Sequence, residues 1–173
     1  RKEKRLMEVY PNERGYKRIV HDIIHNGSYR ETRNGHVKSL PNQILKITGL
    51  DKGLFPLLTT RQIFYKGVLG EYAALIRGPQ NVKDFEKWGC NYCSYLCDKY
   101  GNLNLDYGNL WIDANGVNQM QEVVDLLRHD PTNRRMVISG WNPGKQDDLS
   151  LPCCHYSYQF WCHDQYLDLL WTQ

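Results

Sequence analysis

The feature that most constrains this chain is the order in which strand-like and helical patterns follow one another. Residues 155–161 alternate between apolar and polar side chains, and residues 166–172 repeat the alternation after the turn-forming stretch 162–165. This pattern predicts two strands joined as a hairpin. Helical spacing of apolar residues is found in three other segments, residues 16–26, 62–77 and 118–129. Because no regular strand–helix–strand rhythm links the segments, the sequence predicts an α+β fold or a three-layer arrangement.

The helix expected over residues 62–77 carries an acidic residue, Glu71, within its apolar face. Residues 55–60 are expected to be extended, with Thr60 as the N-cap of the helix over 62–77. Strand character is also expected at 37–47 and 136–138. Glu71 lies within the apolar face of the helix, where a carboxylate is costly unless it is hydrogen-bonded. Glu71 is therefore either a boundary residue or a functional one.

Length and composition exclude several classes of protein. A chain of 173 residues with 41% hydrophobic and 24% charged residues is typical of one folded domain and not of a disordered protein. No apolar run approaches the ~20 residues that cross a bilayer, and residues 1–20 contain no secretory signal, so a cytoplasmic protein without a membrane partner is expected. A net charge of +3 is too small to predict a DNA-binding protein.

The sequence Leu151-Pro-Cys-Cys-His155 is the tightest reactive cluster. A thiolate is a good nucleophile, but adjacent residues of an extended chain point in opposite directions, so His155 is a poor base for Cys154. Fixed positive charge could activate the thiol instead, and Arg134 and Arg135 stand before the strand expected at 136–138. Two adjacent arginines there also fit an anionic partner, above all a phosphate. The alternative is that Cys153 and Cys154 are buried structural thiols.

A second group of cysteines, Cys90, Cys93 and Cys97, has the spacing of a partial metal site. Structural zinc usually takes four ligands, and no nearby histidine completes this set. The spacing also fits one face of a packed helix. The sequence therefore predicts packing rather than a metal at these positions.

Six ordered blocks carry a resemblance to a known family. They are residues 55–60 (FPLLTT), Glu71 in its helix, 106–108 (DYG), 130–135 (DPTNRR), 141–143 (WNP) and 151–160 (LPCCHYSYQF). Together they resemble the thymidylate synthase family from about residue 16 to residue 173. The resemblance implies a large twisted mixed β-sheet flanked by helices, with the sheet face used for dimerisation. It also implies that residues 1–173 are one incomplete catalytic domain, inactive by itself, whose remaining C-terminal part is absent.

The resemblance implies a methyltransferase that converts dUMP to dTMP with 5,10-methylenetetrahydrofolate as the carbon and hydride donor. Cys154 matches the nucleophile that adds to C6 of the pyrimidine, Glu71 a general acid/base, and Tyr107 a residue that assists proton removal at C5. No metal is implied. Such an enzyme is a homodimer and belongs to the cytoplasm, including that of a host cell if a phage encodes it.

The remaining matched residues bind substrate and cofactor. Arg33 matches a phosphate-loop arginine, whereas Arg134 and Arg135 match a pair that is donated to the phosphate in the partner subunit's site. Arg61 stands where a basic residue would meet the folate glutamate tail. Cys93 occupies the place of a tryptophan that steers the methylene intermediate towards hydride transfer.

Departures from the family pattern leave two alternatives open. Besides Cys93, Phe64 stands where a histidine often contacts folate. These changes lie on the folate side, so a dUMP or dCMP hydroxymethylase, in which water quenches the methylene intermediate, is the first alternative. A non-catalytic nucleotide- or RNA-binding homologue is the second. It is disfavoured because Cys154, Glu71 and Tyr107 are all retained, and a binding protein would need only the arginines.

Overall fold

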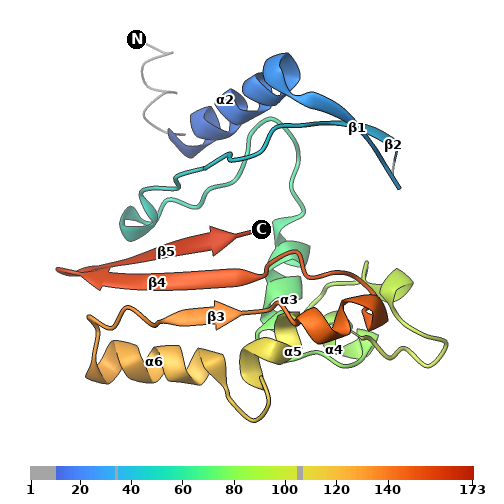
Figure 1. The fold of residues 1–173 in the computed structure, drawn as a ribbon, viewed down its shortest axis with the longest axis vertical. Helices are drawn as coiled ribbons and strands as arrows, with labels where there is room; N and C mark the ends of the chain where they lie inside the picture. Colours follow the sequence, from blue (N-terminus) through green and yellow to red (C-terminus); the bar gives the residue numbers. More distant parts are fainter. Residues whose placement is uncertain (1–10, 34, 105–106) are drawn as a thin grey trace. The chain divides into compact units, whose positions relative to one another are not determined.

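The structure is a computed structural model that describes residues 11–33, 35–104 and 107–173. The chain divides into two compact units, Arg1–Ile63 and Phe64–Gln173, and each is described by itself. Helices and strands are combined in both, as the expected α+β class requires (Figure 1). None of the helices in the described residues is long and apolar enough to cross a membrane.

The first unit contains one long helix and one hairpin. Helix α2 (Pro11–Asn26) covers the helix predicted over 16–26 and ends where the N–H of Gly27 donates to the carbonyl of Ile23 at 2.9 Å. Strands β1 (Ser28–Thr32) and β2 (Gly35–Ser39) pair antiparallel. A short 3-10 turn, η1 (Leu50–Lys52), lies in the irregular segment that follows.

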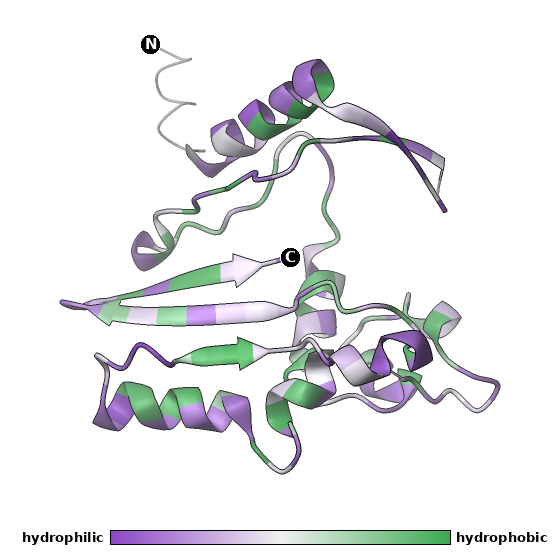
Figure 2. Cartoon of the chain, viewed as in Figure 1, coloured by the Kyte–Doolittle hydropathy of each residue, from purple (hydrophilic) through white to green (hydrophobic). Residues whose placement is uncertain are grey.

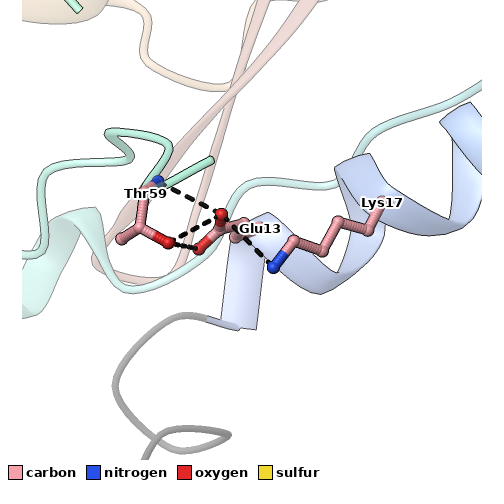
Figure 3. A network of polar contacts seen from close by, with 3 residues as sticks. All are labelled: Glu13, Lys17 and Thr59. Atoms are coloured by element: carbon pink, nitrogen blue, oxygen red, sulfur yellow. Dashed lines mark hydrogen bonds and ion pairs between the residues drawn. The ribbon is translucent and has the colours of Figure 1, made fainter. Parts of the chain in front are cut away.

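Glu13 links α2 to the segment expected to be extended at 55–60 (Figure 3). Its carboxylate is only 6% exposed and accepts hydrogen bonds from the Thr59 hydroxyl at 2.7 Å and the Thr59 N–H at 3.1 Å. Lys17 Nζ lies 3.5 Å from the same carboxylate. The Thr59 hydroxyl, above all, lowers the pKa of Glu13 because it stabilises the ionised form. These contacts hold the extended segment against the helix.

The second unit contains four α-helices among its described residues: α3 (Tyr65–Leu75), α4 (Val82–Glu86), α5 (Tyr107–Ile112) and α6 (Gln119–His129). The Asn118 side chain caps α6 by accepting from the N–H of Gln121 at 2.9 Å. Two 3-10 turns, η2 (Ser94–Leu96) and η3 (Pro143–Asp148), lie in the connections.

The sheet of the second unit is antiparallel, in the order β3-β4-β5 (Figure 1). Its strands are β3 (Val137–Ser139), β4 (Ser157–His163) and β5 (Tyr166–Thr172). The predicted hairpin of 155–161 and 166–172 is thus confirmed. One face buries Ile138 and Tyr158, and Trp111 of α5 packs edge-on against Tyr158 with ring centroids 5.1 Å apart. The larger mixed sheet and the single-domain organisation expected from the family resemblance stay predictions.

Three local predictions were wrong. The strand expected over 37–47 ends at Ser39, since Pro41 lacks an N–H and Asn42 has a positive φ of 59°. Helix α3 begins at Tyr65, and Thr60 does not cap it, because the residue at the N-cap is Phe64. The buried residues of α3 are Gly67, Gly70, Ala74 and Leu75. Its large apolar residues are exposed instead, among them Val68 (53%) and Leu69 (51%).

Candidate active site

Cys154 lies on the connection between η3 and β4, two residues after Pro152. Its side chain is exposed, and its thiol donates to the Pro152 carbonyl with the sulfur 3.7 Å from the oxygen. Cys153, by contrast, is only 7% exposed and belongs to the hydrophobic core. Cys154 lies in a bend before β4, and its side chain faces solvent while that of Cys153 faces the core. Of the two adjacent thiols, only Cys154 is open to a substrate.

Glu71 lies on the buried small-residue face of α3 and is half-buried. Its Oε2 accepts a hydrogen bond of 2.7 Å from the phenol of Tyr92, which lies on the loop before η2. The helix packs closely on this loop because Gly70 has no side chain: a Cβ there would lie 2.1 Å from the Trp88 carbonyl oxygen. Glu71 is thus half-buried and hydrogen-bonded. The hydrogen bond offsets the cost of placing a carboxylate on this face of α3.

His155 connects the cysteine segment to this carboxylate. Burial lowers the pKa of the half-buried His155 imidazole, whereas the nearby negative charge of Glu71 opposes that shift. The ring also packs edge-on against Trp171 of β5, with centroids 4.9 Å apart. The charge of Glu71 therefore acts on the residue that directly follows Cys154. A largely neutral His155 fits local orientation better than proton transfer by a charged imidazolium.

Cys90 and Cys93 lie in a loop and not on one face of a helix. Helix α4 ends at Glu86, Gly89 has a φ of +79°, and the cysteines follow in a loop. The prediction of a packed helix at 90–97 was therefore wrong. Both thiols are nonetheless buried, with their sulfur atoms 3.5 Å apart. Burial, a hydrogen bond to Cys90 and the charges of Cys90 and Glu71 raise the pKa of Cys93. No group of three or more metal-binding side chains gathers within the described ranges.

Arg134 and Arg135 stand at the opposite end of β4 from Cys154. They precede β3, and the pairing of Val137 with Gln159 places them level with the C-terminal end of β4. Cys154 stands before the opposite end of that strand, whose seven residues extend roughly 20 Å at the usual rise. Both arginines are exposed, and neither has an acidic partner among the residues that the structure describes. Activation of Cys154 by these two guanidinium groups of the same chain is therefore ruled out by their separation.

The other predicted residues are placed separately. Arg33 is exposed in the turn of the β1–β2 hairpin, and Arg61 is exposed in a bend that precedes α3; both belong to the first unit. Tyr107 is the first residue of α5, but its side chain and Asp106 lie outside the described residues. The roles of these residues stay predictions.

The contact of Tyr92 with Glu71 was not predicted from the sequence. The phenol of Tyr92 contacts Glu71 across a separation of 21 residues, and no periodic pattern relates the two positions. The only local signal was its place between Cys90 and Cys93, which was interpreted as core packing. A side chain that reaches back from a loop to a helix becomes visible only once the loop is folded.

Comparison with known proteins identifies the class to which this fold and site belong. Residues 14–173 match the family model of thymidylate synthase, and the chain belongs to the thymidylate synthase family. The thymidylate synthase of Enterobacteria phage T4 is 33% identical over 174 residues, which cover 91% of this chain and 60% of the phage protein. A probable thymidylate synthase of Escherichia phage T5 is 34% identical over 176 residues, with coverage of 91% and 62%. The chain thus spans about three fifths of the length of these relatives.

Proposed function

We propose that this chain forms the nucleophile-bearing part of a dUMP methyltransferase that uses 5,10-methylenetetrahydrofolate. The proposal is supported by the family of the chain, by the exposure of Cys154, and by the charge of Glu71, which acts on the pKa of the neighbouring His155. A nucleophilic thiol and a hydrogen-bonded carboxylate would supply the two functions that the reaction requires: covalent addition and proton transfer.

Each residue has a defined task in this proposal. The Cys154 thiolate forms a bond to C6 of the pyrimidine, and the electron pair of the C5–C6 bond moves to C5 and O4 as an enolate. The enolate carbon C5 would then form a bond to the one-carbon unit of the folate, whose bond to the folate nitrogen would break, and in the methyl-forming reaction the folate would also supply a hydride. Glu71 exchanges protons on the O4 side, and Tyr107 assists removal of the C5 proton. Loss of that proton and expulsion of Cys154 restore the ring double bond.

The phosphate of the nucleotide requires cations, and Arg134 and Arg135 of the same chain stand at the opposite end of β4 from Cys154. We assign Arg33 to the phosphate, together with Arg134 and Arg135 of a second subunit. The separation of these two arginines from Cys154 along β4 supports donation across a dimer interface. Guanidinium groups bind phosphate through paired hydrogen bonds, which fixes the nucleotide as well as attracting it.

The outer face of the sheet is the proposed dimer surface. Val137, Gln159 and Leu170 are paired across the three strands and therefore share one face. Val137 is 40% exposed and Leu170 is 50% exposed. Figure 2 shows hydrophobic residues along β3 and much of β5. Pairing two such faces would bury this apolar surface.

Arg61 and Cys93 are assigned to the folate side. Arg61 would meet an acidic tail, whereas Cys93 lies buried beside Glu71 and would shape the floor of the site. A thiol is smaller than the tryptophan expected at this position, so Cys93 also favours the second candidate, a dUMP or dCMP hydroxymethylase. In that enzyme water would reach the methylene intermediate before hydride does.

Two measurements on the complete protein test these assignments. With 5-fluoro-dUMP and methylenetetrahydrofolate, mass spectrometry should find a covalent adduct on the peptide that contains Cys154. Cys154→Ser should lose the adduct, whereas Cys97→Ser should keep it because a serine hydroxyl can replace the Cys97 bond to the Ser94 carbonyl. Absence of the adduct in the unsubstituted protein would favour a binding protein. The mass of the product from dUMP then separates methyl from hydroxymethyl transfer.

The two relatives described above are phage proteins. Their source supports a phage-encoded enzyme that acts in the cytoplasm of its host, where the nucleotide and folate substrates are made.

A further inference from the structure

We propose that Tyr92 is a positioning residue for Glu71, holding one carboxylate oxygen so that the other faces the bound pyrimidine. The inference rests on the proton-transfer role proposed for Glu71. It adds to that role a side chain on a different element, the loop between α4 and η2, whose contact with Glu71 is visible in the structure.

The two carboxylate oxygens of Glu71 have different surroundings. Oε2 accepts the phenol hydrogen bond of 2.7 Å from Tyr92. No hydrogen bond to Oε1 is present within the part of the chain that the structure describes. A hydrogen bond to an ionised carboxylate is short and strong. One oxygen is therefore held by the protein, and the second is open to exchange a proton with a ligand.

Two glycines of α3, Gly67 and Gly70, allow the loop to approach the helix closely. A Cβ on Gly67 would lie 3.0 Å from Cε1 of Tyr92, and a Cβ on Gly70 would meet the carbonyl oxygen of Trp88. Two glycines one turn apart thus leave space for the loop. Since Glu71 follows Gly70 directly, the same packing sets the distance between the phenol and the carboxylate.

The phenol remains a donor over the pH range in which such an enzyme works. Burial, the hydrogen bond to Glu71 and the neighbouring Cys90 thiol all raise the pKa of Tyr92 above its ordinary value. A tyrosine that stays protonated presents its hydrogen to Oε2 at every working pH. A Glu side chain without such a bond would sample several rotamers, because it has three rotatable side-chain bonds.

A double-mutant cycle in the complete protein tests the proposal. Tyr92→Phe removes the hydroxyl and keeps the ring that packs beside Gly67. Tyr95→Phe is the matched control, because Tyr95 is 76% exposed on η2 and its hydroxyl has no hydrogen bond to any residue that the structure describes. Both substitutions are made alone and in a Glu71→Gln background. The readouts are kcat and the KM for dUMP, with the thermal unfolding midpoint as a check on folding.

We expect Tyr92→Phe to lower kcat by about tenfold, the usual scale for a hydrogen bond to a charged group. The KM for dUMP and the unfolding midpoint should stay close to those of the unsubstituted protein, and Tyr95→Phe should be unaltered. In the Glu71→Gln background, Tyr92→Phe should have no further effect on kcat, because the carboxylate that it positions is gone.

Three other results would overturn part of the account, and they can be told apart. A Tyr92→Phe enzyme with unchanged kcat beside a slow Glu71→Gln enzyme removes the positioning role alone. An equal loss of kcat from Tyr92→Phe in both backgrounds would show that Tyr92 acts independently of Glu71. That result would also contradict the positioning role. A fully active Glu71→Gln enzyme instead removes the role proposed for Glu71, and with it the basis of this inference.

Discussion

His155 lies within electrostatic reach of Glu71, although one precedes β4 and the other belongs to α3. This relationship joins the two segments that carry the proposed nucleophile and the proposed acid/base. It also makes the pKa of His155 a reporter of the site, since burial lowers that pKa and the charge of Glu71 raises it.

The first prediction concerns that reporter. In an NMR titration, the His155 ring should titrate below its ordinary pKa of 6.5. Glu71→Gln should lower the pKa of His155 further, because the substitution removes the charge that stabilises the imidazolium. An unchanged or higher midpoint in Glu71→Gln would separate the two residues and contradict the site.

The lowered pKa of His155 also has a consequence for stability. Since the folded state holds the proton less tightly than the unfolded state, protonation favours unfolding. Stability that is present above pH 6.5 should be lost as the pH falls below that value towards the folded pKa. His155→Gln should weaken this dependence in urea unfolding measured between neutral and mildly acidic pH. An identical pH dependence in the variant would contradict the burial of His155.

The second prediction concerns Glu13, whose pKa is lowered by Thr59. A carboxylate with a lowered folded pKa stabilises the protein above its unfolded pKa and loses that contribution as the pH falls. Thr59→Val should therefore reduce the urea midpoint at pH 7, and the difference from the unsubstituted protein should shrink below pH 4.5. Thr60→Val, at an exposed neighbouring residue, is the control. A difference that stays constant with pH would show that Thr59 acts by packing and not through Glu13.

The third prediction concerns the packing of α3 on the loop that carries Tyr92. Ala is favoured over Gly within a helix by about 1 kcal/mol. At Gly70, however, a Cβ would meet the Trp88 carbonyl at 2.1 Å, and a backbone atom is not free to move aside. Overpacking of this kind costs about 1–3 kcal/mol. Gly70→Ala should therefore lower both the unfolding free energy and kcat.

Gly144→Ala provides the matched control for this change. Its Cβ would have an ordinary contact of 3.6 Å with the Asn142 side chain. Stability should be almost unchanged in that variant. If Gly70→Ala were as stable and as active as Gly144→Ala, the close approach of the loop to α3 would not determine the site.

Local patterns predicted the elements whose contacts are close in sequence. The β4–β5 hairpin follows from alternation around a turn, and α6 follows from helical spacing behind the Asn118 cap. Local sequence patterns did not predict which residues are buried where tertiary packing determines burial. Helix α3 buries Gly67 and Gly70 instead of Val68 and Leu69, because the close approach of the loop outweighs the burial of larger side chains.

The candidate site shows the same division. Motif order singled out Cys154 and Glu71 as candidates, but no pattern in the sequence distinguished the exposed Cys154 from the buried Cys153. The distance between Arg135 and Cys154 depends on strand register, which no local pattern contains. Tyr92 reaches Glu71 only through the folded loop, so the sequence offered no sign of the contact.

The central claim is that the site combines Cys154 and Glu71 of one subunit with Arg134 and Arg135 of another. Mixing two inactive variants of the complete protein, Cys154→Ala and the double variant Arg134→Ala/Arg135→Ala, tests it most directly. After subunit exchange, half of the dimers should be mixed, and each mixed dimer should contain one intact site. About a quarter of the unsubstituted dTMP-forming activity should therefore return. No recovery, with subunit exchange verified by mass spectrometry, would place the arginines and the cysteine of each site in the same chain and contradict the account.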